Sequence, residues 1–295
     1  MNERSSRTAS PWKRVGGKAN LHRWIIAHLR EHETYIEGFG GSAPVLLNKL
    51  RPTGQEVYND LDGLWANSLT VARDHGTELA RLIAFTPYGR AEFRRDRLSL
   101  KQWREGKLSV EPLELARLHL VVVRQSFSAN GGSWSTTQYG GENRPRLWAR
   151  LPQIIERMVT RLQGVYIEQK DYRYILDRYD HPRAVFYLDP PYFGVEGLYY
   201  DVNRKDGFDH RALRQHVENR KGSIVISYYA HPDIEALYAG WDIYRHEVTV
   251  HAGDTKRKET ELLIARYSDF AKRRSRWQIQ EFFDDDGRDL MAVTT

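Results

Sequence analysis

The stretch Ala184–Leu188 constrains the fold of this chain more than any other part of the sequence. Its residues are mostly apolar, partly aromatic and free of glycine and proline, which is typical of a buried strand in a parallel sheet. Pro190 and Pro191 then end the strand, because proline has no backbone N–H to donate to a neighbouring strand. In an open α/β sheet, ligands bind beyond the carboxyl ends of the strands. The sequence therefore predicts an α/β fold whose site includes Asp189 and Tyr192.

The segment Asp189-Pro190-Pro191-Tyr192 suits methyl transfer to an exocyclic amine of a nucleobase. Such an amine is a poor nucleophile because its lone pair is delocalised into the ring. The Asp189 carboxylate and the Pro190 carbonyl would accept its two hydrogens and favour a pyramidal nitrogen, which stabilises the transition state specifically. Tyr192 would stack on a base pulled out of the helix. An ordinary turn that closes a strand explains the same four residues. The choice between a catalytic segment and a structural turn therefore depends on motifs elsewhere in the chain.

A strand, a glycine turn and a helix near the N-terminus predict a nucleotide-binding unit. Tyr35–Glu37 is the strand candidate, residues 38–42 read Gly-Phe-Gly-Gly-Ser, and a helical pattern covers residues 43–50. This order begins a Rossmann-like unit. The turn is not GxGxxG, so a dinucleotide pyrophosphate fits poorly. S-adenosylmethionine has no phosphate and suits a different turn.

Val57–Asp60 is the next predicted strand, and it ends in an acid. Asp60 lies 18 residues beyond Ser42, near the spacing at which a carboxylate reaches a ribose hydroxyl. It could instead cap a helix that starts near Asp62; with the glycine turn upstream, we favour the ribose role. Further upstream, Gly16-Gly17-Lys18 precedes a helical pattern and either surrounds an anion or forms a flexible basic lead-in.

Composition excludes several classes. The chain of 295 residues has no cysteine, which rules out disulfides, thiolate zinc sites and the thiolate attack that methylation at cytosine carbon 5 requires. No apolar run approaches the length of a membrane span, and residues 1–10 lack the apolar stretch of a signal peptide, so we expect a cytoplasmic protein. The net charge of +6 and pI of about 9.3 are compatible with a nucleic-acid partner.

From Leu64 to about Arg161 the periodicity changes to that of helices. Residues 86–150 contain twelve Lys and Arg against six Asp and Glu, an excess equal to the charge of the whole chain. Glycine pairs around a β-prone stretch predict an exposed hairpin at 131–146, with a plain surface loop as the alternative. Side chains here that suit base edges or phosphates are Asn130, Ser133, Trp134, Gln138, Tyr139, Arg144 and Arg146.

Parallel-sheet patterning resumes after the helical segment. We expect a strand at 165–167, a helix at 171–179, a loop at 193–206 that could order on substrate, and a strand at 224–228. Two late strands, 241–250 and 261–267, should form an antiparallel pair at the sheet edge, joined by a loop at 251–260. Residues 271–295 read as a loosely attached tail.

Taken together, these motifs resemble the Dam-type DNA adenine-N6 methyltransferases. The shared segments, in order, are Gly16–Lys18, Glu37–Ser42, Asn59-Asp60, Phe127–Gly131, Asp189–Tyr192 and Glu261–Ile264. The resemblance covers roughly residues 11–267. It implies a Rossmann-like seven-stranded methyltransferase sheet, formed by residues 1–64 and 162–270, with an inserted, mainly helical target-recognition domain at 65–161.

The resemblance also implies site residues. Asp189, Pro190, Pro191 and Tyr192 would hold a flipped adenine of duplex DNA, with no metal. The residues expected around S-adenosylmethionine are Trp12, Arg14, Lys18, Glu37, Phe39, Gly40, Gly41, Ser42, Asp60, Asp171 and Asp189.

Three departures from the family pattern stand out. The tryptophan that usually lies two residues before Gly-Gly-Lys is Arg14 here, with Trp12 nearby, so either could contact the cofactor. Gly38 stands where proline is common, and the 131–146 segment lacks the pattern of enzymes that read GATC. Cytosine-N4 methylation, RNA adenine methylation, a non-catalytic DNA-binding module and a dinucleotide-dependent oxidoreductase are the alternatives. The sequence indicates neither the recognition site, nor a phage or restriction–modification role, nor the oligomeric state.

Overall fold

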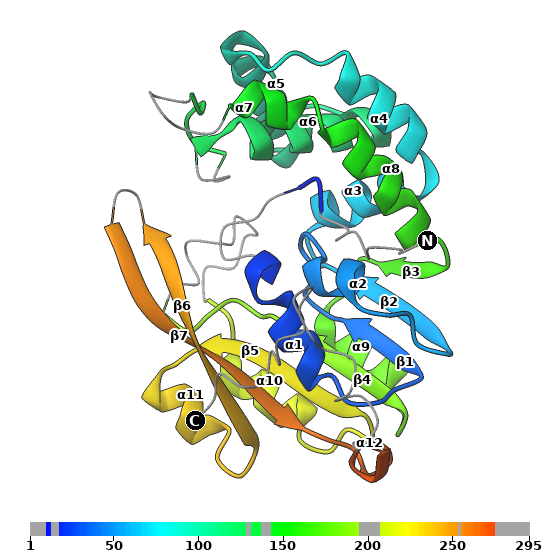
Figure 1. The fold of residues 1–295 in the computed structure, drawn as a ribbon, viewed down its shortest axis with the longest axis vertical. Coiled ribbons are helices and arrows are strands. Elements are labelled where there is room, and N and C mark those ends of the chain that lie inside the picture. The colour runs from blue at the N-terminus through cyan, green and yellow to red at the C-terminus, as the bar shows by residue number, and fades with distance from the viewer. Residues whose placement is uncertain are drawn as a thin grey trace, which may run out of the picture. The chain divides into compact units, whose positions relative to one another are not determined.

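The described strands form a mixed seven-stranded sheet (Figure 1). The computed structural model describes residues 10–12, 18–127, 131–136, 143–194, 207–252 and 255–274. The sheet has the order β3-β2-β1-β4-β5-β7-β6. The strands are β1 (Thr34–Glu37), β2 (Gln55–Asn59), β3 (Val165–Glu168), β4 (Ala184–Leu188), β5 (Ser223–Tyr229), β6 (Asp242–Ala252) and β7 (Thr255–Arg266). The predicted α/β class and seven-stranded sheet are confirmed.

The chain divides into two compact units. The first contains residues 1–20, 40–50 and 58–170, and the second contains residues 21–39, 51–57 and 171–295. The glycine turn and β3 therefore group with the helices of the first unit. The domain boundaries expected from the sequence, at residues 64/65 and 161/162, stay a prediction.

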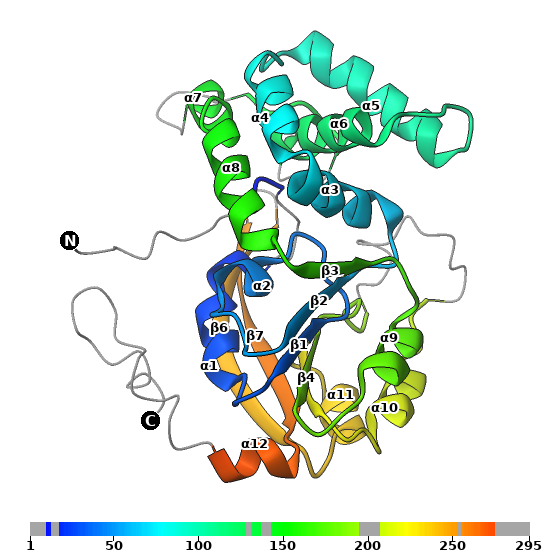
Figure 2. The same ribbon diagram turned by 90° about the vertical axis from the view of Figure 1, so that its right-hand side faces the viewer.

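In the second unit, β4 lies between β1 and β5 and is parallel to both. All five of its residues are buried, as the apolar run predicted. Helices α9 (Tyr172–Tyr179), α10 (His210–Val217) and α11 (Pro232–Leu237) cover one face of the sheet, and α1 (His22–His28) lies on the other (Figure 2). Side chains one residue apart along β4 and β5 alternate between faces, and Phe186, Leu188, Ile224 and Ile226 join the core cluster that includes residues of α9 and α10.

The sheet edge of this unit differs from the expectation. β7 is antiparallel to β6, as predicted, and it is also antiparallel to β5. The connection is shorter than the expected loop at 251–260, which was wrong: pairing continues through Val250↔Arg257 and His251↔Lys256 to Ala252↔Thr255. A run of basic residues reads as a loop in sequence, but charged side chains are well tolerated on an exposed strand.

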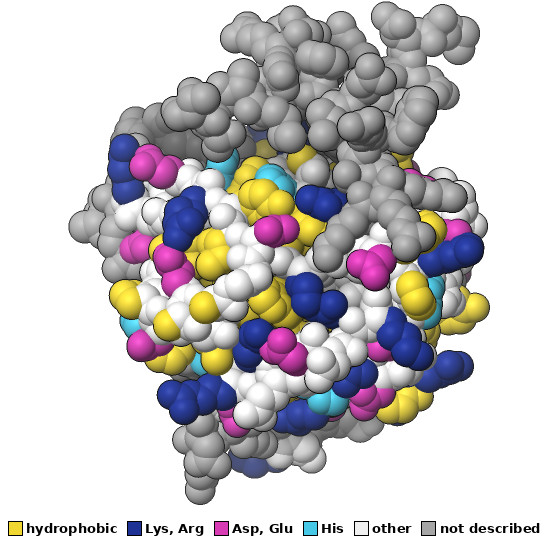
Figure 3. Space-filling model, turned by 90° about the horizontal axis from the view of Figure 1, so that it is seen from below, with side chains coloured by type: hydrophobic (Ala, Val, Ile, Leu, Met, Phe, Trp, Pro, Cys, Tyr) yellow, Lys and Arg dark blue, Asp and Glu magenta, His cyan; other side chains and the backbone are white. Residues whose placement is uncertain are grey.

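Exposed basic side chains of the second unit are matched by acids in several places. The ion pairs include Arg183–Glu33 at 2.7 Å, Arg220–Asp177 at 2.6 Å and Arg245–Glu235 at 2.6 Å. The face shown in Figure 3 likewise intersperses Lys and Arg with Asp and Glu side chains. Such mixed surfaces produce no concentrated positive potential.

Helices dominate the first unit, as the periodicity of residues 64–161 predicted. They are α2 (Pro44–Asn48), α3 (Gly63–Asp74), α4 (Gly76–Ala84), α5 (Arg90–Arg104), α6 (Pro112–Gln125), α7 (Arg144–Trp148), α8 (Leu151–Leu162) and the 3₁₀ turn η1 (Lys18–Asn20). Leu64, Phe93, Leu100, Leu115 and Val122 form a core cluster from α3, α5 and α6. The remaining helix, α12 (Asp269–Arg274), belongs to the second unit.

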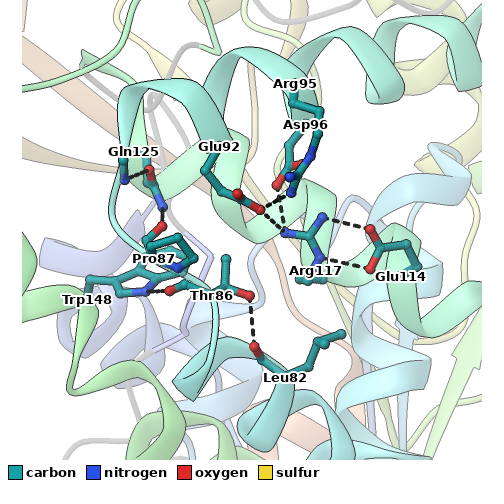
Figure 4. A network of polar contacts seen from close by, with 11 residues as sticks. Leu82, Thr86, Pro87, Glu92, Arg95, Asp96, Glu114, Arg117, Gln125 and Trp148 are labelled. Carbon is teal, nitrogen blue, oxygen red and sulfur yellow. Dashed lines mark hydrogen bonds and ion pairs between the residues drawn. The ribbon is translucent and has the colours of Figure 1, made fainter.

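A buried ionic network joins α5 to α6 (Figure 4). The Arg117 guanidinium donates to both carboxylate oxygens of Glu114 at 2.8 and 2.7 Å and to Asp96 at 2.6 Å. Asp96 is fully buried. Burial disfavours the charged guanidinium, but the hydrogen bonds to Glu114 and Asp96 outweigh it and raise the Arg117 pKa. The network is a structural element of the helical unit rather than a titrating site.

Candidate active site

Asp189 follows β4 at the carboxyl edge of the sheet. Its side chain is only partly buried. Ser227, a fully buried residue of the adjacent strand β5, donates its hydroxyl to Asp189 Oδ1 at 2.7 Å. The Tyr187 hydroxyl lies 3.1 Å from the same Ser227 oxygen. The carboxylate is thus oriented by a neutral donor from the neighbouring strand. Nothing in the Ser227 sequence context indicated this role, because it depends on the register of β4 against β5.

Tyr192 is buried beside Asp189 in the same segment. Its hydroxyl donates to Glu261 of β7, and its ring makes an edge contact with Tyr229 at 4.6 Å between centroids. Burial, followed by the charges of Asp189 and Glu261, raises the Tyr192 pKa well above its usual value. The phenol therefore stays protonated and donates its hydrogen bond at any physiological pH. The expected stacking of this ring on a base stays a prediction.

The end of β1 lies beside the end of β4. Glu37 is the register partner of Tyr187, and the Gly38 N–H donates to the Tyr187 carbonyl at 3.0 Å. Glu37 is buried and accepts a hydrogen bond from the Tyr35 hydroxyl at 2.8 Å. Two strand ends of the second unit therefore deliver Glu37 and Asp189 to one edge, because β1 and β4 are parallel.

Phe39, directly after this strand end, belongs to an aromatic cluster. Its ring centroid lies 5.5 Å from that of Tyr172 and 5.7 Å from that of Phe208. Asp171, expected near the cofactor, caps helix α9 by accepting from the Arg173 N–H at 2.9 Å. The cap explains Asp171 locally, and its cofactor role stays a prediction.

The glycine turn of the first unit is tightly packed against the end of β2. A Cβ atom at Gly40 would lie 2.0 Å from the ring of Tyr58, so only glycine fits there. The Tyr58 hydroxyl donates to the Gly41 carbonyl at 2.7 Å. Gly41 and Ala43 both have positive φ, of 48° and 54°, and the value at Ala43 is strained for a residue with a side chain. Such strain is typical of turns that hold a ligand.

Asp60 stabilises the glycine turn through hydrogen bonds. Its two carboxylate oxygens accept the N–H groups of Gly41 at 2.8 Å and Asp62 at 2.9 Å. The helix cap weighed as an alternative belongs to Asp62, whose side chain accepts from Leu64 at the start of α3. Asp60 and Ser42 are both buried. Because each carboxylate oxygen has two acceptor positions, Asp60 can hold the turn and still bind a hydroxyl.

The N-terminal residues expected around the cofactor are only partly described. Trp12 is buried, with its ring centroid 6.2 Å from that of His119, and its indole N–H has no hydrogen-bond partner among the described residues. Lys18 is buried in η1. Arg14 lies outside the described residues, so the choice between Trp12 and Arg14 stays open.

The expected DNA-reading hairpin at 131–146 differs in its second half, where Arg144 and Arg146 belong to helix α7. Pro145 suits the first turn of a helix, and the Asn143 side chain caps it at 3.0 Å from the Arg146 nitrogen. The strand pairing lies earlier, as a bridge between Ser126 and Trp134. Asn130, Gln138 and Tyr139 lie outside the described residues.

The two other expected DNA contacts are described. Ser133 is exposed, and its carbonyl accepts from the Phe127 N–H at 2.8 Å. Trp134 is half-buried, with the Arg90 guanidinium 4.8 Å from its ring centre. DNA binding by these residues stays a prediction.

Within the described part of the chain, no group of three or more His, Cys, Asp and Glu side chains is arranged to hold a metal ion. Likewise, no helix among the described residues is both long and apolar enough to cross a membrane.

The sheet and the strand-end acids define a Rossmann-like methyltransferase fold, as the sequence resemblance implied. The D12 class N6 adenine-specific DNA methyltransferase family matches residues 15–252, and the chain belongs to this family. It is an enzyme that transfers a methyl group to N6 of adenine in DNA, and S-adenosylmethionine is the methyl donor. The recognition made from the sequence motifs is confirmed.

Solved structures similar to this chain are distant. They include a candidate RNA methyltransferase from Pyrococcus horikoshii, at 8% identity and a TM-score of 0.38, covering 86% of this chain and 84% of that one. A precorrin-6y C5,15-methyltransferase from Geobacter metallireducens has 10% identity, a TM-score of 0.36 and coverages of 84% and 87%. A SAM-dependent methyltransferase from Agrobacterium tumefaciens has 10% identity, a TM-score of 0.32 and coverages of 85% and 62%. A search of curated protein sequences finds no significant match.

Proposed function

We propose that the chain methylates N6 of an adenine flipped out of duplex DNA, by direct in-line transfer without a covalent enzyme intermediate. The observation that carries this proposal is the Asp189 carboxylate, held at the carboxyl edge of the sheet by the Ser227 hydroxyl at 2.7 Å. A hydroxyl donor orients a carboxylate without neutralising it, whereas a guanidinium would. The Asp189 carboxylate is assigned to accept a hydrogen of the adenine amino group.

The proposed catalytic segment extends from Asp189 to Tyr192. Asp189 and the Pro190 carbonyl accept the amino hydrogens, which localises the lone pair on N6 as the methyl group arrives. Pro191 stiffens the turn, because its ring fixes the backbone. Tyr192, fixed by its hydrogen bond to Glu261, supports the extruded base.

The proposed cofactor residues fit S-adenosylmethionine by their chemistry. S-adenosylmethionine supplies an electrophilic methyl group on a positively charged sulfur. Asp60 is assigned to the ribose hydroxyls, and Phe39 to the flat adenine ring. The other proposed contacts are Trp12 or Arg14, Lys18, Glu37, Gly40, Gly41, Ser42, Asp171 and Asp189. The strained turn at Gly41 and Ala43 supports a ligand role for this segment.

The remaining features of the proposal concern context. The basic helical region from residue 65 to residue 161 is proposed to be the target-recognition domain, with Asn130, Ser133, Trp134, Gln138, Tyr139, Arg144 and Arg146 as its DNA contacts. A cytoplasmic location, in a bacterial cell or a phage-infected host, follows from a DNA substrate.

The test is sequencing of DNA from cells that express the chain, with detection of modified bases. We expect N6-methyladenine in a fixed sequence context. N4-methylcytosine, or methylation confined to RNA, would support an alternative reaction, and an unmodified pool would support a non-catalytic binding module.

The assignment of Asp60 has its own test, with a matched control in the same loop. Calorimetry should show S-adenosylmethionine binding to Asp60→Ala weakened by about 10-fold or more, because a hydrogen bond to a charged group contributes about 1.5–3 kcal/mol. DNA binding should change little. Asp62→Ala removes the cap of α3 and the ion pair with Arg104 at 2.9 Å, and it should bind the cofactor normally. Equal cofactor affinities for both variants would contradict the ribose assignment.

A further inference from the structure

The β6–β7 ribbon extends beyond the rest of the sheet. The pairing of β5 with β7 ends at Tyr229↔Glu261, while the pairing of β6 with β7 continues to Ala252↔Thr255. Residues 255–260 of β7 therefore lie past the last register pair with β5, and Figure 1 shows both arrows continuing past the end of β5. We call residues 247–252 of β6 and 255–260 of β7 the outer ribbon.

The outer ribbon leaves the sheet at the edge that carries Asp189. β5 is parallel to β4, so its carboxyl end, Tyr229, lies at the same edge as the end of β4. Glu261, the register partner of Tyr229, accepts the hydrogen bond from Tyr192. The base of the outer ribbon is thus joined directly to the segment assigned to the flipped adenine.

The outer ribbon has consecutive basic residues on β7. Lys256, Arg257 and Lys258 are register partners of His251, Val250 and Thr249. The side chain of Lys258 is 83% exposed, and its ion pair with Glu247 spans 3.7 Å with the glutamate 77% exposed. An exposed pair of this kind contributes about 1 kcal/mol at most, so it does not prevent Lys258 from exchanging the carboxylate for a phosphate.

The length of the outer ribbon suits a nucleic-acid backbone. A strand rises about 3.3 Å per residue, so Lys256 lies roughly 16 Å along the chain from Glu261. Each DNA strand rises 3.4 Å per nucleotide, so this span corresponds to about five nucleotides. A duplex with its target base at Asp189 would therefore have flanking phosphates within the range of the ribbon.

We propose that the outer ribbon binds the DNA backbone beside the target adenine through Lys256 and Lys258, which share one face of β7, while Arg257 adds positive charge on the opposite face. The ribbon adds a phosphate contact to the second unit, apart from the residues assigned to base reading in the helical region. The inference rests on the proposed duplex DNA substrate. Phosphate contacts position DNA and carry no sequence information, so the ribbon should affect all sequences alike.

The test compares the full-length enzyme with the triple variant K256Q/R257Q/K258Q. Fluorescence anisotropy with a labelled duplex, repeated over a series of salt concentrations, measures the dissociation constant and its salt dependence. We expect the dissociation constant to rise on the order of 10-fold, and the salt slope to fall by about 2–3, because each phosphate contact contributes about 0.9 to it. KM for DNA should rise, with kcat and S-adenosylmethionine affinity unchanged.

Two control variants distinguish an effect of the charge of the outer ribbon from an effect on folding. R178Q/R183Q/K221Q removes three exposed basic residues that precede β4 or β5, and should bind DNA like the wild type. K256R/R257K/K258R keeps the charges of the ribbon and should also bind normally. A loss of binding in the charge-preserving variant would overturn the proposal, as would a wild-type salt slope in K256Q/R257Q/K258Q.

Two further outcomes distinguish the inference from the function on which it rests. If the wild type leaves duplex adenine unmodified, the proposed function fails. If the wild type methylates duplex DNA and the triple variant binds and methylates equally well, only the ribbon inference fails. The ribbon inference would also be overturned if the triple variant lost binding to single-stranded RNA but kept its binding to duplex DNA.

Discussion

The two units of the molecule hold carboxylates in opposite ways. In the helical unit, Asp96 is paired with the guanidinium of Arg117, which cancels its charge. In the second unit, Asp189 and Glu261 accept hydrogen bonds from the neutral hydroxyls of Ser227 and Tyr192. A cation satisfies and neutralises a carboxylate, while a hydroxyl orients it and leaves its charge. The first arrangement stabilises a fold, and the second includes the carboxylate that we propose to be catalytic.

The largest effect should follow loss of the charge at the sheet edge. Asp189→Ala should lower kcat by on the order of 10³-fold, because removal of one preorganised polar group at a transition state costs about that much. Fold and most DNA binding should be retained. Methyl incorporation from labelled S-adenosylmethionine measures the loss, with Asp233→Ala as a control at a 72% exposed carboxylate. Normal turnover by Asp189→Ala would end the catalytic assignment.

The next effect concerns stability and belongs to the helical unit. Arg117→Met should destabilise the protein by about 3–5 kcal/mol, since it removes the buried partner of the Asp96 charge and leaves only the exposed Arg95 at 3.2 Å. Urea unfolding followed by circular dichroism measures the change. Arg95 contacts the same acids but is 63% exposed, so Arg95→Met should cost less than about 1 kcal/mol. Equal costs for the two variants would show that burial does not distinguish these arginines.

Ser227→Ala tests the carboxylate that is held by a hydroxyl, Asp189. Loss of the hydroxyl leaves the Asp189 charge in place but less well oriented, so kcat should fall by about 10-fold while KM for DNA stays near its wild-type value. Ser227→Thr retains the hydroxyl and should recover most of the rate. If both variants lose the same activity, the effect comes from packing rather than from the hydrogen bond.

The smallest effect is a pH dependence of stability at α1. Burial, followed by the charges of Arg30 and His246, lowers the pKa of His28 from 6.5, although its hydrogen bond to the Trp24 carbonyl opposes the shift. The folded state therefore binds the proton less readily than the unfolded state, and stability present above about pH 6.5 is lost as the pH falls.

Urea midpoints between pH 7 and pH 5 test this expectation. The wild type should lose more stability over that range than His28→Gln, because that variant lacks the partly buried imidazole. His231→Gln, at a histidine whose side chain is 43% exposed, should follow the wild type. A parallel response of all three proteins would exclude His28 as the cause.

The elements that carry the chemistry were the most predictable from sequence. The apolar run of β4 has the predicted bounds, Ala184–Leu188, because a continuous apolar segment closed by two prolines has few alternatives. Asp189 was expected beyond the carboxyl end of this strand, and it follows β4 directly. The acid that caps α3 was less certain, and the structure assigns it to Asp62 rather than Asp60.

The hydrogen-bond partners of Asp189 and Tyr192 could not be predicted from the sequence. Ser227 reaches Asp189, and Glu261 reaches Tyr192, only through the registers of β4 with β5 and of β5 with β7. No local pattern encodes those registers. The outer ribbon was missed because Lys256–Lys258 has the composition of a loop, and the helix at Arg144 because glycine and amide residues before it favour a turn.

The close packing of Gly40 on Tyr58 has a consequence for how sequences of this kind can diverge. A methyl group at position 40 and the aromatic ring at position 58 would occupy the same volume, with 2.0 Å between the Cβ and the nearest ring atom. A chain that acquires alanine at position 40 must therefore also replace the ring at position 58 by something smaller. That exchange would also remove the hydroxyl that ties down the Gly41 carbonyl. Drift at these two positions should be concerted, with intermediates that carry only one of the changes selected against.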